Sequence, residues 1–222
     1  MTFDFAKECK DNQIDETFVR RIDRKLFLLL ERAERINPNF NQFLSEANKE
    51  VSETNFSNLA VFENLLNRTG IQLYPKEIAA LFMFEYLAIV ESLLTYIVDV
   101  IVFALVSTGK NLQDPKNRDP LKIKYVCLPE EIRLVPLGTK LDFLSANGFS
   151  MIAKHCNVQI RNSSAHLNYT VDNEGNILLP KGDIIKFVDG INDCHDKLRD
   201  AAIGGFIAFR HYYYEKYGKY MP

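Results

Sequence analysis

Apolar residues recur at helical spacing along most of the chain. From Asp15 to Ile36 they fall three or four residues apart, which predicts a first helix with one apolar side. Two shorter helices are predicted at about Phe40–Val51 and Asn55–Asn67, each beginning near an Asn or Ser that can cap it. A much longer apolar run begins at Pro75, a residue suited to a first helical turn, and it predicts a helix to about Ser107.

Polar residues in this long helix follow a pattern of their own. Glu85, Ser92 and Asp99 are seven residues apart, so a regular helix would stack them on one side, toward solvent or an internal polar cleft. The other sides are apolar, as in the central helix of a bundle or a helix that also forms a dimer interface. Glu85, Glu91 and Asp99 interrupt the run before about 18 uncharged residues accumulate, so we predict no membrane span.

The middle of the chain is richer in turn residues. Gly109–Pro120 is predicted to be a loop, and Leu121–Pro136 to be mostly irregular. Within the latter, Lys122–Val126 alternates like a strand and Pro129 resembles a helix start. Thr139–Ala146 is predicted to be a short helix that ends at Asn147-Gly148.

The last third combines a helix, a hairpin and a second long helix. Ser150–Ala165 is predicted to be one helix, and residues 168–179 a short β-hairpin with Gly175 in its turn. Asp183 is the predicted N-cap of a final helix to about Tyr217. Gly190 and Gly204-Gly205 lie inside that helix, where they predict a kink or a close helix approach. The fold class is therefore all-α: a helical bundle with one short β-hairpin. Residues 1–70 are interpreted as an N-terminal helical extension and 71–222 as the main domain.

Composition and charge narrow the function classes. The chain is 47% hydrophobic and 25% charged, an ordinary globular balance, and its net charge of −2 supplies no global basic field for nucleic acid. Six cations on the first helix are mixed with acids, which predicts a solvated face laced with ion pairs, with a phosphate-contacting face as the alternative. They are Arg20, Arg21, Arg24, Lys25, Arg32 and Arg35.

Cysteine usage and the chain start point to a cytoplasmic protein. The four cysteines are far apart and form no Cys-x-x-Cys pair, so we expect buried, reduced thiols instead of a zinc site or a disulfide framework. The first residues carry no charged-then-apolar signal region, and the predicted localisation is therefore cytoplasmic.

The chemistry of the chain is concentrated in Gln159–Tyr169, which reads Gln-Ile-Arg-Asn-Ser-Ser-Ala-His-Leu-Asn-Tyr. Asn162 and His166 are four residues apart and share a helix face, while Arg161 is about 100° round the helix with a side chain long enough to reach the same phosphate. Histidine titrates near neutrality and can move a proton, and the arginine fork can stabilise charge that develops on phosphorus. RNA carries its own nucleophile, the 2′-OH, so these residues fit a cleavage that leaves a 2′,3′-cyclic phosphate and a 5′-OH.

The motif Arg161-Asn162-Ser163-Ser164-Ala165-His166, followed by a hairpin and a long final helix, resembles that of HEPN domains. These are α-helical domains found in many prokaryotic defence and toxin ribonucleases. The resemblance covers about residues 75–217 and leaves the first 70 residues unmatched. It implies a HEPN-type bundle and metal-independent RNA cleavage without a cofactor, in a toxin or an antiviral effector. An antitoxin or regulatory protein would then be a partner.

One motif supplies one histidine, whereas transesterification benefits from both a base and an acid. HEPN ribonucleases pair their motifs in a composite cleft between two copies, so the resemblance implies a homodimer with a two-fold contact. A monomer would need a second histidine, and His155 is the candidate because one continuous helix would place it on the face of Asn162 and His166. Glu85 and Tyr169 are secondary site candidates.

Two alternatives stay open. Arg161 could simply pair with an acid such as Glu85 or Glu91, while Asn162 bridges helices and His166 bonds a carbonyl at the helix end. The other alternative is that the chain is a non-catalytic HEPN-like module that binds RNA, a nucleotide or a protein partner.

Overall fold

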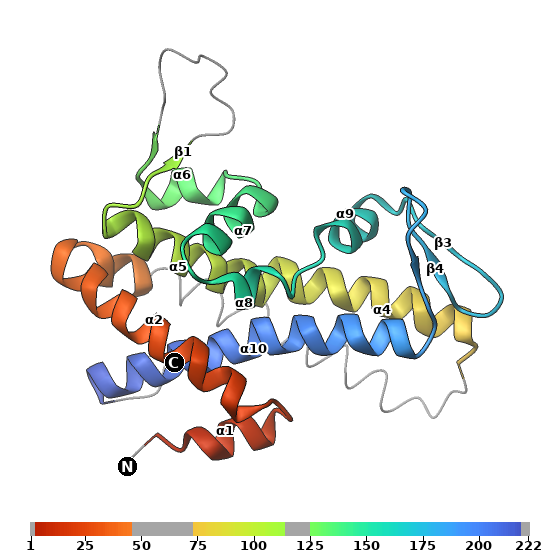
Figure 1. Cartoon of the computed structure of the whole chain (residues 1–222), viewed down its shortest axis with the longest axis horizontal. Coiled ribbons are helices and arrows are strands. Elements are labelled where there is room, and N and C mark those ends of the chain that lie inside the picture. Colours follow the sequence, from red (N-terminus) through yellow and green to blue (C-terminus); the bar gives the residue numbers. More distant parts are fainter. Residues whose placement is uncertain (1–2, 46–72, 114–124, 219–222) are drawn as a thin grey trace.

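The computed structural model describes residues 3–45, 73–113 and 125–218, and the fold is mostly helical (Figure 1). The mainly-α prediction is therefore confirmed. Of the two short helices predicted after the first, residues 40–45 are helical, and the rest of both predictions lies outside the described residues. The described helices are α1 Phe5–Asp11, α2 Glu16–Ile36, α4 Pro75–Ile89, α5 Thr95–Ser107, α6 Pro129–Arg133, α7 Leu137–Ala146, α8 Ser150–Ala153, α9 Val158–His166 and α10 Asp189–Tyr217.

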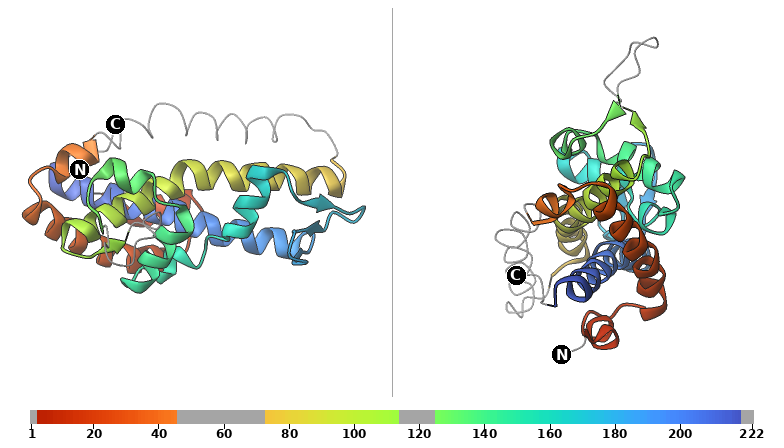
Figure 2. Two further views of the ribbon diagram at one scale, coloured as in Figure 1. Left: turned by 90° about the horizontal axis from the view of Figure 1, so that it is seen from above. Right: turned by 90° about the vertical axis from the view of Figure 1, so that its left-hand side faces the viewer.

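Two long helical rods form the centre of the molecule. One consists of α4, a π-helical turn at Val90–Leu94 and α5, and the other is α10; they run side by side in the same direction (Figures 1 and 2). They approach closely at Gly205, where an added Cβ would come within 2.8 Å of Ile97 Cγ2. The close approach predicted from the paired glycines is confirmed at this point.

α2 completes the same hydrophobic core. Its N-cap is Asp15, whose side chain accepts a hydrogen bond from Thr17 N, as the predicted helix start requires. The buried side chains of Ile22, Leu26 and Leu30 belong to the main apolar cluster together with residues of α5 and α10. The predicted domain boundary near residue 70 stays a prediction, because residues 46–72 lie outside the described part of the chain.

The π-helical turn overturns the predicted polar stripe. Thr95 Oγ1 donates a hydrogen bond to Val90 O, five residues back, and the extra residue in this turn rotates α5 by about 100° relative to a regular helix. As a result Glu85 faces His195 of α10, whereas Asp99 forms a buried ion pair with Lys140 of α7 at 2.6 Å. Glu85 therefore contacts α10 and Asp99 contacts α7. The two carboxylates share neither a solvent-exposed side of the helix nor a common cleft.

In the described part of the chain, Pro75–Ser107 is a stretch long and apolar enough to cross a membrane by length and composition. Most of its apolar window is buried inside the molecule, as in the core helix of a globular domain.

The segment that follows α5 contains more secondary structure than predicted. Tyr125–Val126 forms strand β2, which pairs antiparallel with β1 at Leu112–Gln113, and Pro129 begins α6. The prediction of a mostly irregular Leu121–Pro136 is therefore wrong for residues 125–133, where the alternation and the helix-start signal were the better guides.

The predicted hairpin is confirmed and is part of a larger sheet. β3 (Thr170–Val171) pairs antiparallel with β4 (Ile177–Leu178), and β4 pairs with a third strand, β5 (Ile184–Ile185). Asp183 consequently precedes a strand, and the predicted helix start there is wrong. α10 begins at Asp189, after Val188 adopts a positive φ of 65° within a three-residue turn that Asp189 N closes onto Phe187 O. Its end at Tyr217 agrees with the prediction.

Candidate functional site

The motif helix α9 is held across α4 by its small and apolar side. Ile160, Ser163 and Ser164 are buried, and Ser164 Oγ lies 3.8 Å from Met83 Sδ of α4. Asn157 caps the helix by accepting hydrogen bonds from Gln159 N and Ile160 N. The small serine side chains let α9 lie close to α4, and the opposite side of α9 faces outward.

The predicted single helix over Ser150–Ala165 is wrong, because α8 ends at Ala153 and α9 begins at Val158. The Asn157 backbone N–H, 2.7 Å from Tyr86 Oη, donates its hydrogen bond to that side chain instead of a helical carbonyl. His155 falls inside this break. Its ring stacks on Phe18 of α2 at 5.1 Å, and its Nδ1 lies 3.1 Å from Lys197 O. The premise that His155 shares a helix face with His166 is therefore wrong.

Arg161 is fixed by two neighbours. Its Nε donates to Glu91 Oε1 at 2.6 Å, its Nη2 pairs with the same oxygen, and its Nη1 donates to Asn162 Oδ1 at 3.0 Å. The side chains of Arg161 and Glu91 are 29% and 47% exposed, so the pair is open to water. A guanidinium has five N–H groups. Two of them are free of contacts with the described residues and stay available to an incoming phosphate oxygen.

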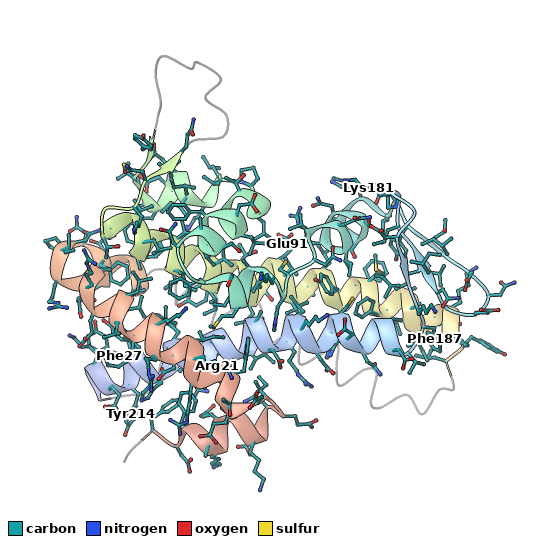
Figure 3. The ribbon with its side chains drawn as sticks, in the orientation of Figure 1. Arg21, Phe27, Glu91, Lys181, Phe187 and Tyr214 are labelled. Carbon is teal, nitrogen blue, oxygen red and sulfur yellow. The ribbon has the colours of Figure 1, made fainter. Side chains whose placement is uncertain are left out.

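Glu91 is presented by the π-helical turn, near the point where α4 passes α9 (Figure 3). Such turns insert one residue into a helix and are frequent at functional sites. The pairing of Arg161 with Glu91, predicted from the sequence only as a structural alternative, is confirmed. Its place in the site depends on the π turn, which the apolar periodicity does not signal.

Asn162 and His166 lie on the exposed side of α9. Within the described residues, the His166 ring makes no hydrogen bond or ion pair, in contrast to the carbonyl contact that a purely structural role would predict. His166 is the last helical residue, because Leu167 follows it with a left-handed φ of 51°. Asn168 N then donates to Ser163 O and closes the helix end. This turn leaves the imidazole at an open helix terminus.

The two secondary site candidates, Tyr169 and Glu85, lie in different parts of the structure. Tyr169 is half-buried between α9 and β3, and burial raises the pKa of its phenol. Glu85 lies 3.4 Å from His195 Nε2 and raises the pKa of that imidazole by its hydrogen bond; it does not contact Arg161. Glu85 therefore joins α4 to α10, apart from the Arg161–Asn162 pair.

The cysteines near and far from the site differ in environment. Cys156, in the break before α9, is buried, and burial raises the pKa of its thiol to about 12 despite the nearby Arg161. Cys9 is also buried and has a pKa raised to about 11 by burial. Cys127 is exposed, so the prediction of buried thiols is wrong for that residue. The two buried thiols are protonated at neutral pH and chemically inert.

Comparisons with family models, curated proteins and solved structures found no match to this chain. The interpretation of the site therefore depends on its geometry.

Proposed function

We propose that the chain is a metal-independent endoribonuclease of HEPN type, active in the cytoplasm as a homodimer. The observation that carries the proposal is the outward side of α9, where Asn162 and His166 are exposed and Asn162 accepts a hydrogen bond from an arginine that also pairs with Glu91. The permanent cation of Arg161 and the imidazole of His166, which has no partner among the described residues, supply charge stabilisation and proton transfer, the two functions that RNA transesterification needs.

In the proposed reaction, His166 accepts the proton of a ribose 2′-OH as the oxygen attacks the adjacent phosphorus. The new O2′–P bond forms, negative charge builds on the phosphate oxygens near Arg161, and the P–O5′ bond breaks. The leaving 5′-oxygen takes a proton from a protonated histidine. The products are a 2′,3′-cyclic phosphate and a 5′-OH end, and all atoms come from RNA and the two imidazoles.

The contacts of the four histidines support the proposed dimer. The chain has four histidines, and three of them contact other groups: His155 stacks on Phe18, His195 faces Glu85, and His211 Nδ1 is 2.8 Å from Asp23. One copy thus offers only His166 on the face of α9. In our proposal the second imidazole comes from a second copy, with α9 and the exposed side of α4, where Phe84 is 50% exposed, forming the contact. An antitoxin or regulatory protein as a further partner stays part of the proposal.

The second candidate is a non-catalytic module that binds RNA, a nucleotide or a protein. The Arg161–Glu91 pair favours it, because a structural role alone would account for that contact.

Incubation of cellular RNA with the purified chain in EDTA, followed by mapping of the new ends, separates the two candidates. We expect cyclic phosphate ends with the wild type and at least a hundredfold slower cleavage with His166→Ala or Arg161→Ala. His155→Ala is the matched control, since it removes a histidine outside the site, and should keep most of the activity. Absence of cleavage by the wild type on diverse RNAs would favour the binding module.

The dimer is tested separately by subunit exchange. Wild-type chain mixed with an excess of His166→Ala chain should lose activity per wild-type subunit, because mixed dimers hold one imidazole in the cleft. Unchanged activity, with exchange verified by labelled subunits, would contradict the shared site.

A further inference from the structure

α2 carries a continuous row of cations on its outer side. Its members, called here the α2 cationic face, are all exposed: Arg21, Arg24, Lys25, Arg32 and Arg35. At 1.5 Å rise per residue, the row from Arg21 to Arg35 is about 21 Å long. The net charge of the whole chain is −2, so this face is a local feature and not part of a general basic surface.

Three of the four acids of α2 contact groups outside the row. Asp23 contacts His211, and Glu34 accepts hydrogen bonds from Tyr212 and Tyr217, so both carboxylates face α10. Glu16 pairs with Arg20 beside the row. Within the described residues, the α2 cationic face therefore lacks the predicted lacing with ion pairs.

Among the described residues, no carboxylate lies within ion-pair distance of the cations in this row. Lys25 Nζ donates to the backbone oxygen of Gly148, and Arg35 Nε donates to that of Glu31. The guanidinium groups of Arg21, Arg24 and Arg32 contact neither an acid nor a carbonyl of the described chain. The row thus has strong hydrogen-bonding capacity for anions that the described part of the chain leaves open.

We propose that the α2 cationic face binds the sugar–phosphate backbone of a single RNA strand. Four of its five cations are arginines, whose planar fork matches phosphate oxygens, and a row of this length suits a chain of phosphates better than a single anion. Each neutralised phosphate releases a condensed counterion, so the contact contributes affinity without sequence preference.

An anionic membrane fits this face less well. A helix that binds a membrane surface inserts its apolar side among the lipids. The apolar side of α2 packs into the cores of the protein, where Val19, Leu26 and Leu30 are fully buried. Leu28, 62% exposed within the row, is available to contact a base, as apolar side chains do in many single-strand sites.

The position of α2 connects this face to the motif. Lys25 bonds to Gly148 between α7 and α8, and Phe18 stacks on His155 in the break that leads into α9. The choice of RNA as the polyanion rests on the proposed function, whereas the anion-binding character of the face does not.

The test measures binding apart from cleavage. The probe is a fluorescent 20-nucleotide RNA with 2′-O-methyl groups, which lacks the nucleophile and stays intact on any form of the protein. We expect Arg21→Gln/Arg24→Gln/Arg32→Gln to bind it at least tenfold more weakly than wild type at 50 mM salt. The slope of log K against log salt should be shallower by about 2, since each lost single-strand contact contributes about 0.7.

The matched control is Lys7→Gln/Lys10→Gln/Lys110→Gln, which removes three exposed cations outside the row and should bind within twofold of wild type. Equal affinities of the two triple variants would overturn the proposal, as would loss of phosphatidylserine-vesicle binding in the α2 variant with RNA binding unchanged. Thermal melts verify that both variants are folded. If the wild type binds the probe through α2 but cuts no RNA, the proposed function fails and this inference stands; the reverse pattern overturns this inference alone.

Discussion

Arg161 holds its charge between a carboxylate and an amide on the surface of the molecule. Because Glu91 is about half exposed, its ion pair with Arg161 is worth at most about 1 kcal/mol, and a substrate phosphate can compete with it. The pair orients the guanidinium without immobilising it. On this view Glu91 is a positioning residue for the proposed reaction, and its contribution is geometric.

Removing the Glu91 side chain should therefore act mainly by lowering kcat. We expect Glu91→Ala to lose about tenfold or more in kcat, because a small displacement of Arg161 misaligns it with the phosphate. Glu91→Gln keeps an oxygen that accepts from Arg161 Nε and removes a negative charge near the substrate, so kcat should stay higher and KM should fall. Steady-state cleavage of a defined RNA separates the two constants, and a rise of KM in Glu91→Gln would contradict this role.

Leu167 is a second residue of interest, because its backbone has a left-handed conformation. A leucine at φ 51° is strained by about 1 kcal/mol, and 66% of its side chain is exposed, so little burial is lost with it. Leu167→Gly should stabilise the fold by about 0.5–1 kcal/mol in urea unfolding. Leu134→Gly is the control: Leu134 is 69% exposed at an ordinary φ of −81°, and the same substitution there should destabilise.

Residue types and local spacing were enough to select Arg161, Asn162 and His166 as candidates from the sequence, because the motif lies within one helical segment. The acidic partner of Arg161 was harder to predict from the sequence. Glu85 and Glu91 were equal candidates on an assumed regular helix, and the π turn, which brings Glu91 to α9, leaves no mark in the apolar pattern. The hydrogen bond between Arg161 and Glu91 joins residues 70 positions apart in the sequence, and it depends on this local irregularity of the helix.

Helices with a periodic apolar side and a capping residue were the predictable elements. The bounds of α2 and the C-terminal ends of α7 and α10 agree with their periodicity and capping signals. The break at residues 154–157 has no such signal in the sequence. There, the Asn157 backbone N–H bonds to the Tyr86 side chain from another helix, and no local propensity encodes that contact. Likewise Ile184–Ile185 joined a sheet through its pairing with β4 and not through a turn signal of its own.

The packing of α10 on α5 leads to a prediction at this scale. Gly205→Ala would place a methyl group 2.8 Å from Ile97 Cγ2 in a buried interface, and it should destabilise the fold by about 1–3 kcal/mol. Gly138→Ala is the matched control, since Gly138 lies in α7 with nothing within 4 Å of an added Cβ. That change should stabilise the fold by about 0.5–1 kcal/mol through helix propensity. Denaturant unfolding of both variants measures the contrast, and equal effects would refute the close contact.

At the scale of the whole molecule, Glu34 joins the last turns of α2 to the last turns of α10. Lys216 Nζ lies 2.9 Å from its carboxylate, and Tyr212 and Tyr217 donate hydrogen bonds to it from the end of α10. Burial acts to raise the pKa of Glu34, but these hydrogen bonds outweigh it and lower that pKa to about 2. The carboxylate is thus more stable as an anion in the folded chain than in the unfolded one.

Stability against acid should depend on this residue. A lowered folded pKa contributes stability that is complete above the unfolded value of 4.5 and is lost as the pH falls toward about 2. Glu34→Gln should therefore be less stable than wild type by about 2 kcal/mol at pH 7, and the difference should disappear as the pH approaches 2. Urea unfolding across this range gives the measurement. Glu130→Gln, which changes an exposed acid on α6, should stay within about 0.5 kcal/mol of wild type at pH 7, and a constant Glu34→Gln difference at every pH would contradict the linkage.

The π turn at Val90–Leu94 has a consequence in genetic terms. An in-frame loss of one codon from this turn would restore a regular helix and change the rotational phase between α4 and α5. Such a chain could keep Glu91 beside Arg161 or Asp99 beside Lys140, but not both without distortion. A single-residue deletion here is thus expected to be far less tolerated than most point substitutions in the same helix, and natural variation in chain length should avoid this turn.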